Sequence, residues 1–444
     1  MKLEVIKSYT LAILVGISLI LSISLWSYSP NDDLLDEEQL LDPSELDLGG
    51  TEKTKKAIVQ PSQIIFSKNK FQQSYFGFAN PNDRIKLYND MTSWVLYNFR
   101  AVDGNGRPNN DLLVELIYPE ELPMEIIPNL FTVNNQDNFG IQENLSFQRV
   151  YITFSESTNS LTFIFLSTDG KTQLRADVNN TQKYEVLDNY IKNLTGLEEY
   201  IKLEDREYPV YLPIEPKMTY YTWTTYEPAN EANIIKNALF PYPKEVVENR
   251  TEENITWYQD GTRAMQVFEH ELSLEFIDPQ EEMFVDPMNT IELLDKGIAE
   301  INGYKGWLHD YHLEDVNRMN NLITYQMHYK GYPVFNPDNL ATIEQRLVNN
   351  ELAEHRQPIY KIYTTASENY VLETGLDVIN HLKNTNSLYN ISEIQDIRVG
   401  YRLSYHVPAD QNAYISLTPT WYIKVNDIWQ QVLLEDDIHR EEVS

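Results

Sequence analysis

Residues 11–26 read LAILVGISLILSISLW, and no charged residue occurs over positions 8–31. A helix of about 20 apolar residues is long enough to cross the hydrocarbon core of a bilayer. Two lysines precede this stretch, and five acidic residues follow it between positions 32 and 38. Because basic flanks stay in the cytoplasm, we expect residues 1–8 to be cytoplasmic, 9–28 to form a transmembrane signal anchor, and the remainder to lie outside the cell membrane.

A cleaved secretory signal peptide is the alternative, because a short basic segment also precedes the apolar stretch of such signals. The late cleavage candidate with small residues at the right spacing is Ser27-Tyr28-Ser29, and cleavage there would leave Pro30 as the first mature residue. We therefore favour the uncleaved anchor. Trp26 and Tyr28 then suit the outer interface of the bilayer, where aromatic rings are enriched.

Two pairs of small residues at a spacing of four occur within the expected anchor: Ala12 with Gly16, and Ser18 with Ser22. Helices associate in lipid through close packing of small residues, so these positions are candidates for contact with a partner helix. The alternative is that glycine and serine are simply common in membrane helices. Neither pair is the full glycine motif.

The composition limits the classes of partner. The net charge of -32 argues against nucleic acid and gives no support for binding anionic lipid headgroups. The chain contains no cysteine, which excludes disulfides, thiolate nucleophiles and thiolate metal ligands. Hydrophobic residues make up 42% and aromatic residues 12%, which indicates globular domains rather than disorder.

The pattern along the chain predicts an α+β protein in which helices pack on antiparallel sheets. An acidic juxtamembrane stalk is expected over 29–56, because its like charges repel one another and keep it extended. Three mixed α+β ectodomains are expected to follow, over 57–203, 204–284 and 285–444. Helix followed by antiparallel strands recurs in each of them.

Four local predictions can be compared directly with a structure. A helix after Pro81-Asn82-Asp83 is expected to bury a stripe that continues to Phe99. Asp260-Gly261 is expected to turn a hairpin between strands at 255–258 and 264–268. Asp286-Pro287 is expected to cap the next helix, and the chain is expected to end in separate strands at 413–417 and 421–425.

The sequence contains little that would support an enzyme. The densest group of possible metal ligands is His309-Asp310-Tyr311-His312-Leu313-Glu314-Asp315, and a zinc hydrolase would need such ligands to converge on one open site. We expect instead a solvated polar loop there, because the chain has no H-E-x-x-H, no G-x-S-x-G and no phosphate-binding loop. No catalytic residue, metal or cofactor is predicted.

Several motifs in order along the chain resemble one family. The chain opens with Lys2-Leu3-Glu4-Val5-Ile6-Lys7, and its apolar span closes in Leu25-Trp26-Ser27-Tyr28-Ser29-Pro30. Further motifs are Gly331-Tyr332-Pro333-Val334-Phe335, Val399-Gly400-Tyr401 and Pro419-Thr420-Trp421. With the single anchor and the total length, these motifs resemble the YycH (WalH) family from end to end. The long acidic stalk is the departure from that family.

The resemblance implies a regulator of the sensor histidine kinase WalK (YycG) in low-GC Gram-positive bacteria. It implies a complex with the kinase and with YycI, which is similar to the C-terminal part only, and so control of cell-wall metabolism. It also implies a three-domain ectodomain without enzymatic activity.

We therefore expect a single-pass cell-membrane protein that regulates this kinase, with homodimerisation left open. The alternatives are a peptidoglycan-binding surface protein without kinase contact and, ranked lower, a surface hydrolase. The abundant tyrosines could line a sugar-binding groove, although the alternation of Tyr325 and Tyr329 fits core packing better.

Overall fold

A computed structural model describes residues 43–69, 73–134, 144–203, 209–224, 231–251, 255–268, 272–279, 286–384, 391–408 and 412–433. The chain divides into two compact units, Met1–Leu46 and Asp47–Ser444. The described part of the first unit is a single 3-10 turn, η2 (Pro43–Leu46). The predicted anchor at 9–28 lies outside the described residues. Within those ranges, none of the helices combines the length and the apolar character that crossing a bilayer requires.

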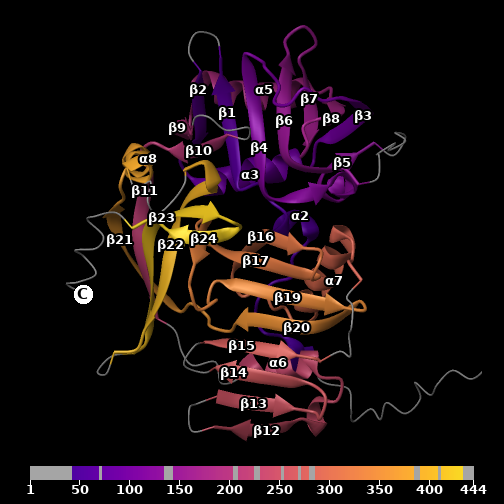
Figure 1. The fold of residues 1–444 in the computed structure, drawn as a ribbon, viewed down its shortest axis with the longest axis vertical. Helices are drawn as coiled ribbons and strands as arrows, with labels where there is room; N and C mark the ends of the chain where they lie inside the picture. The colour runs from indigo at the N-terminus through magenta and orange to yellow at the C-terminus, as the bar shows by residue number, and fades with distance from the viewer. Residues whose placement is uncertain are drawn as a thin grey trace, which may run out of the picture. The chain divides into compact units, whose positions relative to one another are not determined.

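The second unit begins with a ten-stranded sheet that is antiparallel except between β3 and β5 (Figure 1). Its spatial order is β10-β9-β2-β1-β4-β6-β7-β8-β3-β5. The strands are β1 (Gln63–Lys68), β2 (Ser74–Phe78), β3 (Val95–Asp103), β4 (Leu112–Pro123), β5 (Thr132–Val133), β6 (Ser146–Ser155), β7 (Ser160–Ser167), β8 (Thr172–Val178), β9 (Leu197–Leu203) and β10 (Val210–Pro213).

Two longer helices accompany this first sheet, α3 (Pro81–Met91) and α5 (Thr181–Asn193). Asn180 caps α5, since its side-chain oxygen accepts hydrogen bonds from the backbone N–H groups of Gln182 and Lys183. Leu187 and Ile191 are buried, and α5 packs on β1 and β7. Shorter helical turns are α2 (Lys55–Ile58), η3 (Met124–Ile126) and α4 (Ile127–Leu130).

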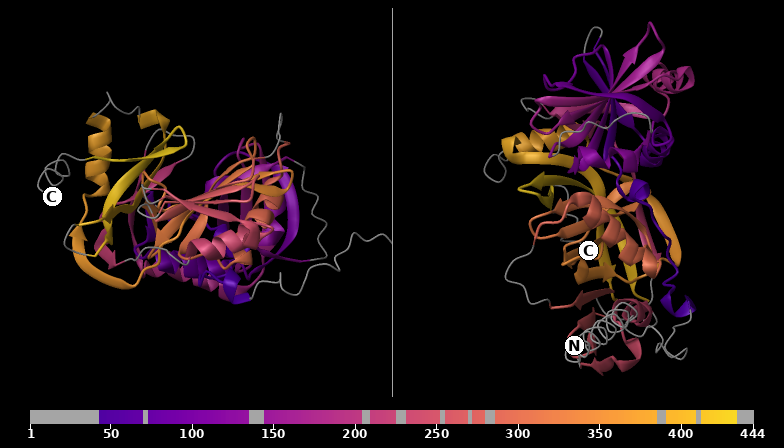
Figure 2. Two further views of the ribbon diagram at one scale, coloured as in Figure 1. Left: turned by 90° about the horizontal axis from the view of Figure 1, so that it is seen from below. Right: turned by 90° about the vertical axis from the view of Figure 1, so that its right-hand side faces the viewer.

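A fourteen-stranded sheet forms the rest of the unit, in the order β12-β13-β14-β15-β20-β19-β17-β18-β22-β23-β11-β21, with β16 on β17 and β24 on β23 (Figures 1 and 2). Within it, β18 and β22 run parallel. The strands are β11 (Lys217–Thr224), β12 (Val247–Arg250), β13 (Ile255–Gln259), β14 (Ala264–Phe268), β15 (Ser273–Ile277), β16 (Asp310–Asn317), β17 (Leu322–Tyr329), β18 (Tyr332–Phe335), β19 (Thr342–Val348), β20 (Glu351–Pro358), β21 (Thr364–Val371), β22 (Ile394–His406), β23 (Tyr414–Val425) and β24 (Ile428–Gln431).

The helices of this second sheet are α6 (Glu231–Leu239), α7 (Thr290–Gly303) and α8 (Gly375–Asn384), with 3-10 turns η4 (Pro243–Glu245) and η6 (Ile391–Glu393). Helix α7 packs on β17 and β19. Its cap is Asn289, whose side chain accepts from the Glu292 N–H, so the expectation of a cap at Asp286-Pro287 is wrong. An asparagine next to the first apolar turn meets the requirement better, because a cap must reach an N–H two or three residues on.

The mixed α+β class and the Asp260-Gly261 hairpin, formed by β13 and β14, are confirmed. The helix expected after Pro81-Asn82-Asp83 is confirmed as α3, but its expected extent to Phe99 and the separate C-terminal strands are wrong. Helix α3 ends at Met91, and the chain from Val95 onward is strand β3, in which Val95 is 51% exposed. The two strands expected at the C-terminal end are one strand, β23, which continues through Pro419 opposite Tyr401.

Strand pairing crosses two of the expected domain limits. Strand β15 lies before the expected boundary at 284, yet it pairs with β20 of the same sheet. Strand β10, expected in the second ectodomain, pairs with β9 of the first sheet. Strand pairing between distant segments therefore crosses both boundaries.

The C-terminal end of the expected stalk is folded, which corrects the prediction of an extended segment over 29–56. Leu48 is fully buried, and its N–H donates to the Tyr304 carbonyl oxygen at 2.9 Å. Thr51 forms an antiparallel bridge with Trp307, and the Lys53 ammonium lies 2.5 Å from an Asp310 carboxylate oxygen. Buried apolar contact and specific pairing thus override the charge repulsion from Asp47 onward.

Candidate functional site

The three C-terminal motifs of the sequence lie on three adjacent strands. Gly331-Tyr332-Pro333-Val334-Phe335 makes a turn and strand β18, which runs parallel to β22 with Val334 opposite Tyr401. Strand β22 in turn pairs Gly400 with Thr420 of β23. A Cβ atom on Gly400 would lie 2.8 Å from the Pro333 carbonyl oxygen, so the glycine permits this close approach.

The turn that begins this motif contacts the first sheet's helix α3. Gly331 has φ +82°, and a Cβ atom there would lie 2.7 Å from Cβ of Pro81. Arg84 of α3 donates from Nη2 to the Gly331 carbonyl oxygen at 3.2 Å. Burial lowers the pKa of Arg84 to about 10. The motif therefore forms part of the joint between the two sheets.

A buried ionic cluster lies beside this joint. The Arg398 guanidinium donates to Glu314 at 3.0 Å and to Asp396 at 2.7 Å, and it lies 4.6 Å from the ring centroid of Trp429. Trp429 donates its indole N–H to the same Glu314 carboxylate at 2.8 Å. Burial opposes the charge on Arg398, but Glu314 and Asp396 keep its pKa above the usual value. The Lys424 ammonium lies 3.9 Å from Glu314.

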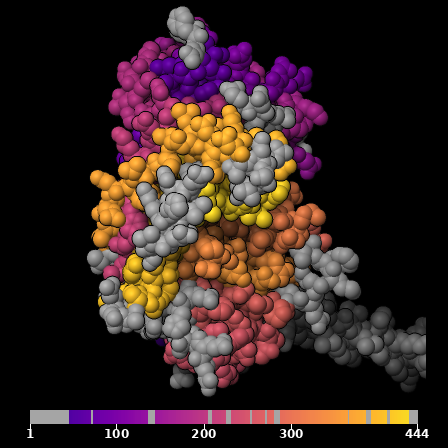
Figure 3. All heavy atoms as spheres, turned by 60° about the vertical axis from the view of Figure 1, so that its left-hand side comes forward, coloured from indigo at the N-terminus to yellow at the C-terminus, as the bar shows by residue number. Residues whose placement is uncertain are grey.

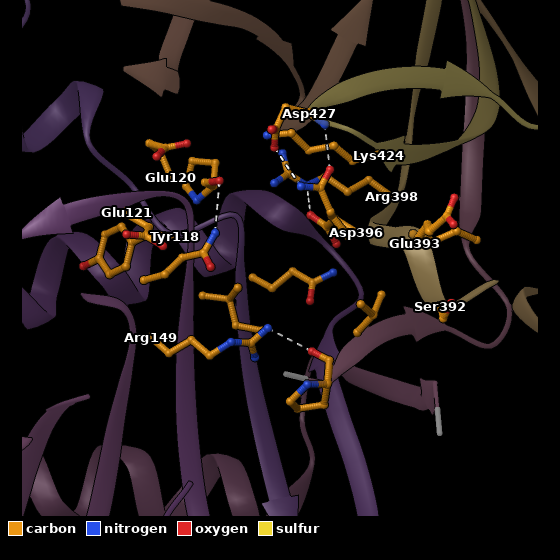
Figure 4. A pocket seen from close by; sticks show the side chains of 18 residues that line it. Tyr118, Glu120, Glu121, Arg149, Ser392, Glu393, Asp396, Arg398, Lys424 and Asp427 are labelled. Carbon is orange, nitrogen blue, oxygen red and sulfur yellow. Dashed lines mark hydrogen bonds and ion pairs between the residues drawn. The ribbon is translucent and has the colours of Figure 1, made fainter. Parts of the chain in front are cut away.

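A cavity of about 520 Å³ opens between the two sheets next to this cluster. Figure 4 shows Glu120 and Arg149 on the strands of the first sheet, with Asp396, Arg398 and Lys424 across the cavity. The full lining is Gln63, Ile117, Tyr118, Pro119, Glu120, Glu121, Gln148, Arg149, Pro209, Val210, Ser392, Glu393, Ile394, Gln395, Asp396, Arg398, Lys424 and Asp427.

Glu120 is the lining carboxyl group with the most altered acidity. Burial, followed by the charge of Asp315, raises the pKa of Glu120 to about 7. Burial also raises the pKa of Asp315, while Lys424 opposes that change. Since β4 and β16 contact each other, the two carboxyl groups meet where the two sheets meet.

A second buried ionic group stabilises the wall of the cavity that the first sheet forms. Glu115 is fully buried and pairs with Arg149, while Arg107 Nε lies 3.3 Å from it and the Tyr211 hydroxyl donates to it at 2.9 Å. Arg149 also donates to the Pro209 carbonyl oxygen at 3.0 Å. These bonds hold the chain at Pro209 and Tyr211, just before the segment that leads from β10 to the second sheet.

The predicted polar loop at 309–315 is instead a buried strand, β16, so that prediction is wrong. His309 is in ring contact with Tyr360 at 4.8 Å, and His312 with His328 at 4.2 Å. Glu314 points to Arg398. Within the described ranges, no three histidine, aspartate or glutamate side chains gather closely enough to hold a metal ion.

The candidate partner-contact residues Ala12, Gly16, Ser18 and Ser22 lie outside the described residues. The tyrosines considered for a sugar-binding groove are among the described residues. Tyr325 is fully buried, and Tyr329 packs against Tyr221 and Trp223 with ring centroids 4.9 and 4.8 Å apart. These tyrosines belong to the core.

Sequence reasoning missed the residues around the cavity. Glu120 lies on β4, a strand that none of the four local predictions covers. Lys424 lies in the strand expected at 421–425, where a lysine within an apolar stretch indicates a partly buried charge. Their meeting depends on contacts between segments about 300 residues apart, which no local pattern encodes.

Comparison with known proteins finds matches that together extend over most of the chain. The model of the YycH protein N-terminal domain matches residues 4–196, and that of the C-terminal domain matches residues 208–437. The "Two-component system WalR/WalK regulatory protein YycH" of Bacillus subtilis (strain 168) is 21% identical over 451 residues, 96% of this chain and 95% of that protein. The crystal structure of YycH from Bacillus subtilis matches with a TM-score of 0.67 at 16% identity, covering 87% of this chain and 99% of that one. The resemblance noted from the motifs is confirmed: the chain belongs to the YycH family.

Proposed function

We propose that this protein is a membrane-anchored extracytoplasmic regulator of the WalR/WalK two-component system. The observation that carries the proposal is the end-to-end match to a protein named as a regulator of that system, at 96% coverage of this chain. Both family domains are present and in order. The proposed location is the cell membrane, with residues 9–28 as the anchor and the folded unit outside.

The proposed mechanism is a complex with the kinase WalK and with YycI that shifts the kinase between its signalling states. A bound regulator can shift such an equilibrium only by binding the two states with different affinity. The anchor pairs Ala12–Gly16 and Ser18–Ser22 are the proposed helix contacts in the membrane. The protein acts without catalysis in this proposal.

The first experiment tests regulation. The gene is deleted in its own host, and transcription from WalR-dependent promoters is measured in the deletion strain and after restoring the gene. A change in either direction that the restored gene reverses supports the proposal. Unchanged transcription across growth phases and cell-wall stress contradicts it.

The second experiment tests the contact. A photoreactive residue is placed in turn at Ala12, Gly16, Ser18 and Ser22 of the full chain in its native membrane. Leu14 serves as the control for Ala12 and Gly16, and Ile20 as the control for Ser18 and Ser22, because helical geometry puts each control opposite its own pair. Products that contain the kinase or YycI at the small-residue positions alone support the proposed face. Equal products at Leu14 and Ile20 contradict that face.

The peptidoglycan-binding alternative is tested with the same full chain. Co-sedimentation with purified cell wall, together with unchanged WalR-dependent transcription in the deletion strain, would replace the regulatory proposal with the alternative.

A further inference from the structure

The cavity between the two sheets has the size and setting of a small-ligand site. Its volume of about 520 Å³ falls within the range of roughly 300–1,000 Å³ typical of ligand pockets, which occur preferentially between domains. Residues of β4 and β6 form one wall, and residues of η6, β22 and β23 form the other. The face drawn in Figure 3 carries residues of both sheets, the orange and yellow C-terminal segments beside the magenta and indigo ones.

The charges of the lining favour a cation. Five lining residues are acidic and three are basic. Each base already has a carboxylate partner: Arg149 has Glu115, while Arg398 and Lys424 share Glu314. Neither Glu115 nor Glu314 is a lining residue, whereas Asp396, the second carboxylate partner of Arg398, is one.

Glu120 lines the cavity, and its side chain shares a hydrogen bond with Asp315, but no lysine or arginine is in ion-pair contact with it among the described residues. The charged groups that act on its pKa are Asp315 on β16, which raises it, Lys424 on β23, which lowers it, and Glu121 on β4, which raises it. Glu314 adds a further negative charge beside Asp315. Burying a carboxylate among other carboxylates is unfavourable, and a bound cation would relieve that repulsion.

We propose that this cavity binds an organic cation, a ligand that carries a primary ammonium or guanidinium group, with Glu120 as the carboxylate that contacts it. Glu121, Glu393 and Asp427 at the exposed rim would raise the local concentration of such a ligand. The proposal goes beyond regulation of the kinase and does not depend on it.

An organic cation fits better than a metal ion. No three metal-ligating side chains gather among the described residues. The lining also includes the apolar residues Ile117 and Val210, whose small exposed areas could contact a methylene stem. A lysine or arginine side chain combines such a stem with a terminal cation.

A ligand in this position would touch both sheets at once. It would therefore bind most tightly to the arrangement of the sheets in which both walls are in reach, and so favour that arrangement over others. The site offers a physical route by which a small cation could act on the second unit.

The test measures binding by calorimetry to the full chain in detergent micelles at pH 7. The probes are Nα-acetyl-lysine amide and Nα-acetyl-arginine amide, and the matched neutral control is Nα-acetyl-norleucine amide. We expect at least one cationic probe to bind and the neutral one to bind at least tenfold more weakly. Saturable binding of norleucine amide with equal affinity, or no binding of either cationic probe up to 10 mM, would overturn the proposal.

The variant Glu120→Gln identifies the contact. It keeps the shape of the side chain and removes a like charge from beside Asp315, so the variant should fold. We expect at least a tenfold loss of affinity, whereas Glu248→Gln on the exposed strand β12 should bind as the wild type does. Unchanged binding by Glu120→Gln would overturn the assignment.

Proton release gives a second readout. Since the pKa of Glu120 is raised to about 7, about half of the molecules carry a proton there at pH 7. A cation favours the ionised form, so binding should release up to about half a proton, seen as a dependence of the heat on the ionisation enthalpy of the buffer. Binding without proton release in the wild type would contradict the role of Glu120.

Discussion

Arg84 of helix α3 donates a hydrogen bond to the carbonyl oxygen of Gly331, 3.2 Å away, and so joins the first sheet's helix to the turn between β17 and β18 of the second sheet. Gly331 lies in a left-handed conformation directly against Pro81 of the same helix. The joint between the sheets thus depends on a position with no side chain.

Gly331→Ala should destabilise the protein by about 3 kcal/mol, since a positive φ costs an alanine about 1 kcal/mol and overpacking adds the rest. Gly261→Ala is the matched control, because Gly261 also has positive φ but nothing lies within 4 Å of its Cβ position. Chemical unfolding of the two variants measures the difference. If both variants lose the same free energy of unfolding, Pro81 moves aside for the new methyl group at no energetic cost.

Glu314→Gln should cost about 3 kcal/mol of unfolding free energy, because it leaves the buried Arg398 with reduced compensation. The side chains of both residues are less than a tenth exposed, at 7% and 8%. Glu354→Gln breaks an ion pair with Arg346 in which Glu354 is 47% exposed, and it should cost less than about 1 kcal/mol. A small effect of Glu314→Gln would mean that Asp396 alone can hold Arg398.

His309 should make the protein less stable in mild acid. Burial lowers its pKa to about 4 in the folded state, against 6.5 for an exposed histidine. Between pH 6.5 and 4 the unfolded chain therefore binds a proton that the folded chain does not, and stability falls by roughly 1.4 kcal/mol per pH unit as the pH falls.

The variant His309→Gln isolates this effect. Raised pKa values of about 7 at Glu120 and Glu198 give slopes of the opposite sign, so the wild type alone is not informative. Between pH 7.5 and 5, wild type should lose about 2 kcal/mol more than the variant. Parallel stability curves would show that His309 is protonated while folded.

Leu48→Ala should destabilise the folded unit by about 3 kcal/mol, because Leu48 is completely buried. Glu52→Ala, on the same segment but exposed, should change stability by less than about 0.5 kcal/mol. Urea unfolding of the full chain, followed by tryptophan fluorescence, distinguishes them. If neither variant changes the urea midpoint of unfolding, the segment from Asp47 is not packed on the folded unit and is an extended stalk.

Local patterns predicted the parts of the fold that depend on neighbours in sequence. The hairpin of β13 and β14 follows from Asp260-Gly261 between alternating strands, and the start of α3 follows from Pro81-Asn82-Asp83. The errors arose where contacts between distant segments determine the secondary structure. The apolar period after Met91 continues unbroken into a strand, and Pro419 lies within a strand opposite Tyr401.

Local sequence patterns could not predict the candidate site either, because contacts between distant segments form it. The motif residues 331–335 were noted from the sequence, but their contact with Pro81 and Arg84 was not. His309 to Asp315 looked solvated because six of its seven residues are polar or titratable, whereas Glu314 is buried against an arginine 84 residues away. The sequence alone does not show that a charged residue is buried unless the residue that pairs with it is known.

The bonds from Leu48, Gly50 and Thr51 to residues 304–307 also determine how the folded unit carries tension. A pull on the chain ahead of Asp47 meets these bonds, and the pair between Lys53 and Asp310, before it reaches β1. The second sheet therefore takes the mechanical load first, although the first sheet comes first in sequence.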